Sequence, residues 1–75
     1  MTVLRESPWY QEIKREGKRE ALLSGIALGL ELKFGADGLL LLPEIRRIEA
    51  VGKLEMIQAA IRTVQTLEEL RQIYI

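Results

Sequence analysis

The fold is decided by residues 16–35, EGKREALLSGIALGLELKFG, in which a small residue recurs at every fourth position. On an α-helix each step of four advances about 40° beyond a full turn, so these positions form one slowly drifting ridge. The ridge consists of Gly17, Ala21, Gly25 and Gly29. Three glycines inside a helix cost roughly 0.5–1 kcal/mol each relative to alanine. Because close approach of another helix is the usual compensation, the stretch predicts a helix–helix contact surface and no reaction centre.

The helix that carries this ridge is predicted to run from Pro8 to Phe34. Ser7 is suited to the N-cap and Pro8 to the first helical position, while Gly35 is a natural C-cap. Lys33 lies in the last turn, where a positive charge is favourable against the helix dipole. At 1.5 Å per residue this helix is about 40 Å long. A chain of 75 residues has too little material to cover that length, so we expect a partner to contact part of it.

The rest of the chain predicts shorter helices, and no segment shows strand alternation. The expected elements before the last two helices are a loose tail over 1–7, a turn over 35–38 with Asp37 as a cap for the next helix, and one or two helical turns from Pro43 to Ile48. An amphipathic helix is expected over Val51–Val64. The last helix is opened by the capping box Thr66-Leu67-Glu68-Glu69. The expected buried faces of the last two helices are Val51, Leu54, Met56, Ile57, Ala60 or Ile61, and Val64, followed by Leu67, Leu70, Ile73 and Tyr74. We therefore predict a single all-α domain over 1–75, with shorter helices across 39–75 and a hairpin-like or bundle-like arrangement.

Composition excludes several function classes. The chain has no cysteine and no histidine, which removes disulfides, thiolate metal sites and the commonest general base. Eleven basic and eleven acidic residues give zero formal net charge, so the overall balance argues against nucleic-acid binding. No secretory signal is visible, and the longest uncharged run, Ala21 to Leu30, is too short to span a bilayer. We expect a cytoplasmic protein without a cofactor or a membrane partner.

The order of features also resembles a known family. A Ser-Pro-Trp-Tyr-Gln start leads into a glycine-punctuated charged helix, then into Leu30-Glu31-Leu32-Lys33-Phe34-Gly35, a leucine-rich segment over 39–45 and the ending Thr66-Leu67-Glu68-Glu69-Leu70. Over about residues 7–74 this resembles the helical C-terminal region of the Rpn-like recombination-promoting nuclease and transposase-related proteins of cyanobacteria. In that family the chemistry belongs to an N-terminal nuclease domain of the PD-(D/E)xK type, which has no counterpart here. The resemblance implies a tail module, either free-standing or part of a nuclease- or transposase-like protein, and a nuclease-like protein as a candidate partner.

One short pattern matches part of such a nuclease motif. Glu31-Leu32-Lys33 spells E-x-K, in which the glutamate would hold Mg²⁺ and the lysine would orient water. The metal needs further carboxylates, and the only aspartate, Asp37, is expected to be a helix cap. On a helix Glu31 and Lys33 also point about 200° apart. We therefore interpret both as solvated helix residues and predict no catalytic residue, no metal and no enzymatic activity.

The alternative function is an accessory DNA-binding module. A basic stripe in the first half of the long helix would contact phosphate, and it consists of Lys14, Arg15, Lys18 and Arg19. Glutamates at positions 12, 16 and 20 weaken its field, and no aromatic residue is interleaved for base stacking. We interpret the stripe first as a solvated or salt-bridging face, and nucleic-acid contact stays the second interpretation.

Two interpretations of the small-residue ridge remain open. The first is packing against the chain's own helices, over Val51–Val64 or Leu67–Tyr74. The second, which the length of the helix favours, is contact with a second copy, most simply in a dimer. The predicted seam consists of Gly17, Ala21, Leu22, Gly25, Ile26, Gly29 and Leu30. The sequence thus predicts a non-catalytic module for self-association or protein interaction.

Overall fold

A computed structural model describes residues 8–75, with side chains from residue 11 onward. Every regular element in this part of the chain is a helix, which confirms the all-α prediction. The helices are α2 (Pro8–Phe34), α3 (Ala36–Leu39), α4 (Leu42–Ile45), α5 (Val51–Ala60) and α6 (Leu67–Tyr74). The predicted bounds of the long helix are confirmed. The predicted tail over 1–7 and the N-cap Ser7 lie outside the described residues.

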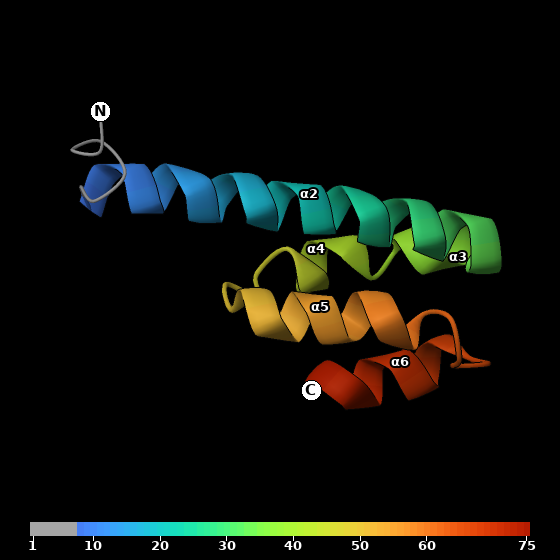
Figure 1. Cartoon of the computed structure of the whole chain (residues 1–75). Coiled ribbons are helices and arrows are strands. Elements are labelled where there is room, and N and C mark those ends of the chain that lie inside the picture. The colour runs from blue at the N-terminus through green and yellow to red at the C-terminus, as the bar shows by residue number, and fades with distance from the viewer. Residues whose placement is uncertain (1–7) are drawn as a thin grey trace.

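The shorter helices pack on one side of α2 (Figure 1). Helix α5 runs alongside α2 in the same direction, and α6 returns against the side of α5 that faces away from α2. The short helices α3 and α4 connect the end of α2 to the start of α5. Between these helices lies one hydrophobic core, made of Leu23, Ile26, Leu30, Ile45, Leu54, Ile57, Ile61, Val64, Leu70 and Tyr74.

Helix α2 is longer than the body that packs against it. The molecule measures 47 × 20 × 20 Å along its principal axes, and the N-terminal end of α2 extends beyond α5 (Figure 1). Residues 11–18 are all exposed, whereas Leu23, Ile26 and Leu30 farther along the helix are buried. We call residues 11–18 the overhang. The C-terminal part of α2 therefore holds the core together, and the overhang buries no side chain against the body.

The segment after α2 differs from the prediction. Gly35 ends α2 with φ 69°, a left-handed conformation in which glycine avoids a Cβ clash. The predicted turn over 35–38 was wrong beyond Gly35, because α3 begins at the next residue. Asp37 lies in the first turn of α3, and no side-chain bond caps either α3 or α4. Gly38 is buried, and a Cβ there would lie 2.6 Å from the backbone oxygen of Leu30. Gly38 thus allows α3 to pack directly against the backbone of α2.

The remaining elements follow the prediction with shorter bounds. Helix α5 ends at Ala60, before the predicted Val64, although Ile61 and Val64 are still buried in the core. Met56, expected near the buried face, is exposed instead. The Thr66 hydroxyl accepts a 3.1 Å hydrogen bond from the Glu69 backbone N–H, which confirms the predicted N-cap of α6.

Candidate interaction surface

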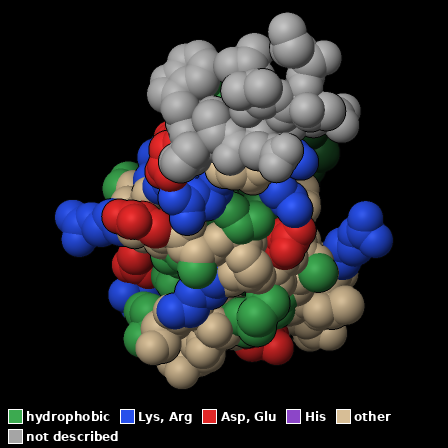
Figure 2. Space-filling model, turned by 60° about the vertical axis from the view of Figure 1, so that its left-hand side comes forward, with side chains coloured by type: hydrophobic (Ala, Val, Ile, Leu, Met, Phe, Trp, Pro, Cys, Tyr) green, Lys and Arg blue, Asp and Glu red, His purple; other side chains and the backbone are tan. Residues whose placement is uncertain are grey.

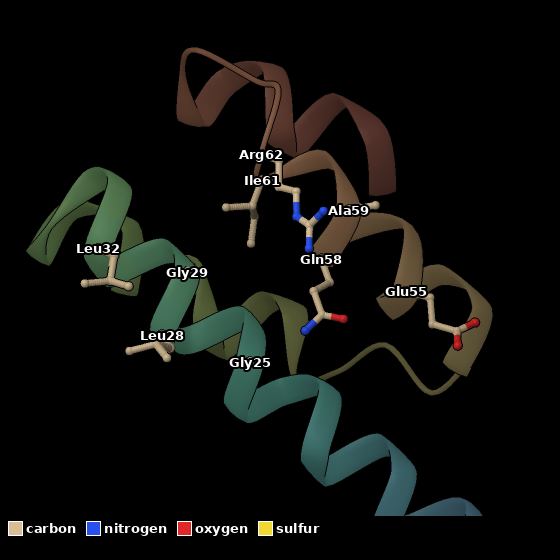
Figure 3. Close-up of a pocket in the computed structure, with 9 residues that line it drawn as sticks. All are labelled: Gly25, Leu28, Gly29, Leu32, Glu55, Gln58, Ala59, Ile61 and Arg62. Atoms are coloured by element: carbon tan, nitrogen blue, oxygen red, sulfur yellow. The ribbon is translucent and has the colours of Figure 1, made fainter.

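Two glycines of the predicted ridge face α5 of the same chain. A Cβ on Gly29 would lie 3.4 Å from Cγ2 of Ile61, and a Cβ on Gly25 would clash with the side-chain amide of Gln58. Figure 3 shows Gln58 reaching from α5 toward Gly25, and Ile61 pointing toward Gly29. For Gly25 and Gly29 the structure therefore supports the first interpretation, packing within the chain.

The aliphatic members of the predicted seam lie largely in the core. Ile26 and Leu30 have 0% of their surface exposed, and Leu22 is half-buried against the same core. Placing Ile26 and Leu30 on a surface between copies was wrong, because they occupy the side of α2 that packs against the body. Of the predicted seam, only Gly17 and Ala21 are exposed.

A groove of about 480 Å³ runs between α2 and α5. Gly25 and Gly29 line it from α2, and Glu55, Gln58, Ala59, Ile61 and Arg62 line it from the side of α5. Arg62 and Gln58 extend into the space between the helices, which makes this wall of the groove polar (Figure 3). Leu28 and Leu32 border the groove but point away from α5 (Figure 3). Leu28 and Leu32 therefore belong to the outside of α2.

We define the outer face of α2 as the exposed positions opposite the core, spaced alternately three and four residues apart. They are Lys14, Gly17, Ala21, Ser24, Leu28 and Glu31. Leu28 is 58% exposed, and Leu32 beside this face is 78% exposed. No described residue lies within 4 Å of a Cβ built on Gly17. The outer face is thus uncharged between Lys14 and Glu31, and no described residue of the chain packs on it at Gly17.

The basic stripe is largely engaged inside the chain. Arg15 binds Glu12 with a shortest distance of 2.6 Å, and Lys18 lies 3.6 Å from Glu55 of α5. The Arg19 side chain, 19% exposed, donates to the backbone oxygens of residues 46 and 48 in the loop before α5. Lys14 is exposed on the outer face.

The surface around the stripe carries both signs of charge. A shallow depression beside it is lined by Glu12, Arg15, Glu16, Arg19 and Glu49. In the view of Figure 2, acidic and basic side chains alternate across the surface, and neither sign forms a continuous patch. This mixture weakens the attraction for a phosphate backbone. The structure thus gives a nucleic-acid interface little support.

Glu31 and Lys33 lie on different sides of α2. Glu31 belongs to the outer face, whereas the Lys33 Nζ donates a 2.7 Å hydrogen bond to the backbone oxygen of Ile61 at the end of α5. Lys33 therefore caps a neighbouring helix, although the sequence suggested that it would favour the end of its own. Among residues 8–75 no group of three acidic side chains is positioned to hold a metal ion. In the same part of the chain, no helix is both long and apolar enough to cross a bilayer.

Comparison with known proteins adds no relative. No family model, no curated protein and no solved structure matches this chain. The resemblance to Rpn-like proteins stays a hypothesis drawn from the sequence.

The outer face contains residues that the predicted seam lacked. Ser24 and Leu28 are exposed on it, whereas the step-of-four ridge leads from Ala21 toward Gly25 and Gly29 beside α5. No residue type repeats along this face: the positions seven apart are Lys14, Ala21 and Leu28 in one series and Gly17, Ser24 and Glu31 in the other, so periodicity gave no signal for it. Which side of α2 the body covers is fixed by packing, and the sequence alone did not show it.

Proposed function

We propose that this protein is a non-catalytic helical module that associates with a second copy of itself through the outer face of α2. The observation that carries the proposal is the exposure of Leu28 and Leu32 on a helix whose opposite side already packs into the core. Burying a leucine side chain is worth about 1.5–3 kcal/mol, so covering this face in both copies is favourable. A symmetric pair covers the same face twice with one set of contacts.

Catalysis and nucleic-acid binding receive less support. Glu31 and Lys33 lie on different sides of the helix, and the amine of Lys33 is engaged by the Ile61 carbonyl. Three of the four basic-stripe residues contact Glu12, Glu55 or loop carbonyls within the chain. A module that contacts protein uses the exposed Leu28 and Leu32 directly, whereas a DNA-binding module would first have to release these arginine and lysine contacts.

The test is light scattering coupled to size exclusion over a concentration series. We expect the wild-type chain to associate as concentration rises, and Leu28→Glu to weaken association at least about tenfold, since each 1.4 kcal/mol is a factor of ten. Leu40→Glu is the matched control, because Leu40 is 75% exposed and lies after α3, away from the outer face. Circular dichroism checks that both variants keep their helix content. A wild-type chain that stays monomeric at high micromolar concentration would exclude the proposed function.

A further inference from the structure

The outer face of α2 carries a large side chain, Leu28, toward its C-terminal end and no side chain at Gly17, toward its N-terminal end. Leu28 projects from it, and eleven residues earlier a Cβ built on Gly17 would have no described neighbour within 4 Å. Along a helix that separation is about 16 Å. A glycine in a helix interior costs up to about 1 kcal/mol relative to alanine. Neither a turn nor a contact with the described residues accounts for Gly17, since it lies inside α2 and faces away from them.

The ends of the outer face carry opposite charges. Lys14 lies at its N-terminal end and Glu31 at its C-terminal end, both exposed. Between them the face is formed by Gly17, Ala21, Ser24 and Leu28, which carry no charge. A surface with one positive and one negative end complements a copy of itself that runs in the opposite direction.

We infer that two copies pair with their α2 helices antiparallel along the outer face, an arrangement that rests on the proposed self-association. When the two faces overlap end to end, Leu28 of each copy lies over Gly17 of the other, and Ala21 lies beside Ser24. The same register brings Lys14 of each copy to Glu31 of the other. On two antiparallel helices, positions spaced alternately three and four residues apart meet in layers. One register therefore places the large Leu28 side chain over Gly17 and also brings the opposite charges of Lys14 and Glu31 together.

A parallel pair of α2 helices would match neither the side-chain sizes nor the charges across the contact. Each residue would face its own copy, so Lys14 would meet Lys14 and Glu31 would meet Glu31, which is repulsive. Gly17 opposite Gly17 would leave a gap, and a gap at a contact loses dispersion energy. Leu28 would meet Leu28 and hold the helices apart near that gap.

The antiparallel arrangement also covers the overhang. The shorter helices lie on one side of α2 (Figure 1), and the outer face is on the other side. In the pair the two bodies would therefore lie on opposite sides of the two α2 helices. Residues 11–18 of each copy then run beside the C-terminal half of the other copy's α2, where Leu28 and Leu32 are exposed. The part of α2 that buries nothing against its own body thus gains a packing surface from the second copy.

Cysteine cross-linking distinguishes the two directions. The chain has no cysteine of its own, so each introduced thiol is unique. Under mild oxidation, mixed Gly17→Cys and Leu28→Cys proteins are expected to form a disulfide between the two variants at least about tenfold faster than Leu28→Cys forms one with itself. Disulfides need Cα atoms within about 7 Å, and in an antiparallel pair the two copies of position 28 are about 16 Å apart. Faster linking of Leu28→Cys to itself would overturn the antiparallel inference.

A charge exchange tests the register without touching the apolar contacts. Lys14→Glu alone and Glu31→Lys alone should each weaken association roughly three- to thirtyfold, since each creates two like-charge contacts per pair. The double variant should restore wild-type association. Lys53→Glu with Glu68→Lys, at exposed sites on α5 and α6, is the matched control and should change association less than about twofold. A double variant as weak as the single ones would overturn the inference.

These experiments distinguish a failure of the proposed self-association from a failure of the antiparallel arrangement alone. A wild-type chain that stays monomeric overturns both and leaves the outer face to a different protein. A chain that associates but links position 28 to position 28 keeps the proposed function and loses only the antiparallel arrangement.

Discussion

Two glycines of this fold, Gly38 and Gly52, differ in how closely other residues pack against them. Gly38 in α3 is pressed against the backbone of α2 at Leu30, so hydrogen is the only side chain that fits without movement. Gly52 near the start of α5 has no described residue within 4 Å of a Cβ position. The same residue type therefore has a packing role at one position and an apparent cost at the other. Only the neighbours of each glycine, and not its sequence context, distinguish these cases.

Gly38→Ala is expected to destabilise the fold by about 1–3 kcal/mol, the usual cost of forcing extra volume into a packed site. The new Cβ would lie 2.6 Å from the Leu30 oxygen, a backbone atom that cannot rotate away. Gly52→Ala is the matched control and should instead stabilise the helix by up to about 1 kcal/mol. Urea unfolding followed by circular dichroism measures both changes. Equal effects of the two substitutions would contradict the close contact between α3 and α2.

At the scale of whole elements, the sequence predicted those helix starts and ends that are set by residues close to them in the chain. The long helix has the predicted bounds, because Pro8 and Gly35 are strong local signals for a start and an end. The N-cap at Thr66 is likewise a local pattern, and the structure confirms it. The segment 35–42 was predicted poorly, since α3 is stabilised by its contact with α2 at Gly38. No local pattern announces such a contact.

The candidate site divides in the same way. Periodicity showed that α2 carries a small-residue surface, and the exposure of Gly17 and Ala21 agrees with that. Periodicity did not show which arc of an almost uniformly apolar helix faces the body. For this reason Ile26 and Leu30 were assigned to the seam, and Leu28 was missed. Placing α5 beside the ridge requires contacts between residues about thirty positions apart in the chain, such as Gly29 and Ile61.

Hydrogen bonds to Glu44 of α4 from Arg71 and Tyr74 connect α6 to α4. Arg71 donates two hydrogen bonds to the Glu44 carboxylate, at 3.0 and 3.2 Å, and the Tyr74 hydroxyl donates a third at 2.6 Å. The hydrogen bonds from Arg71 and Tyr74 lower the pKa of Glu44. Burial and the bond to Glu44 raise the pKa of Tyr74, so its hydroxyl stays protonated and continues to donate. The contact between α4 and α6 therefore depends on a charged Glu44.

Lowering the pH should release this contact between α4 and α6. Because the pKa of Glu44 is lowered in the folded state, its stabilisation is complete above the ordinary value of 4.5 and is lost as pH falls through the lowered value. Glu44→Gln should therefore lower Tm at pH 7, and the difference from wild type should shrink at about pH 2. Thermal unfolding of both proteins across pH measures this. Glu16→Gln, on the exposed overhang, is the control and should show little difference at either pH. A Glu44→Gln effect that is the same at both pH values would contradict an electrostatic origin.

At the scale of the whole molecule, the elongated shape indicates how the proposed association would affect stability. The core is small, and a 75-residue domain buries a limited fraction of its surface. The N-terminal end of α2 extends beyond α5 (Figure 1), and every residue of the overhang is exposed, although Lys18 lies near Glu55 of α5. Isolated helical segments of this length are marginal in water. Contact with a second copy would therefore supply packing that the single chain lacks, and unfolding should depend on protein concentration.

We expect Tm of the wild-type chain to rise with concentration once the chain is associated. A tenfold increase favours the folded pair by about 1.4 kcal/mol, or about 0.7 kcal/mol per chain, which corresponds to roughly 3–6 °C for a domain of this size. Leu28→Glu should remove this dependence, because an exposed substitution changes the single chain's stability little but disrupts the outer face. Leu40→Glu, also exposed but outside that face, should retain it. Differential scanning calorimetry over a roughly hundredfold concentration range makes the comparison. If all three proteins unfold at concentration-independent temperatures, the chain is stable alone, and the outer face contributes nothing to folding.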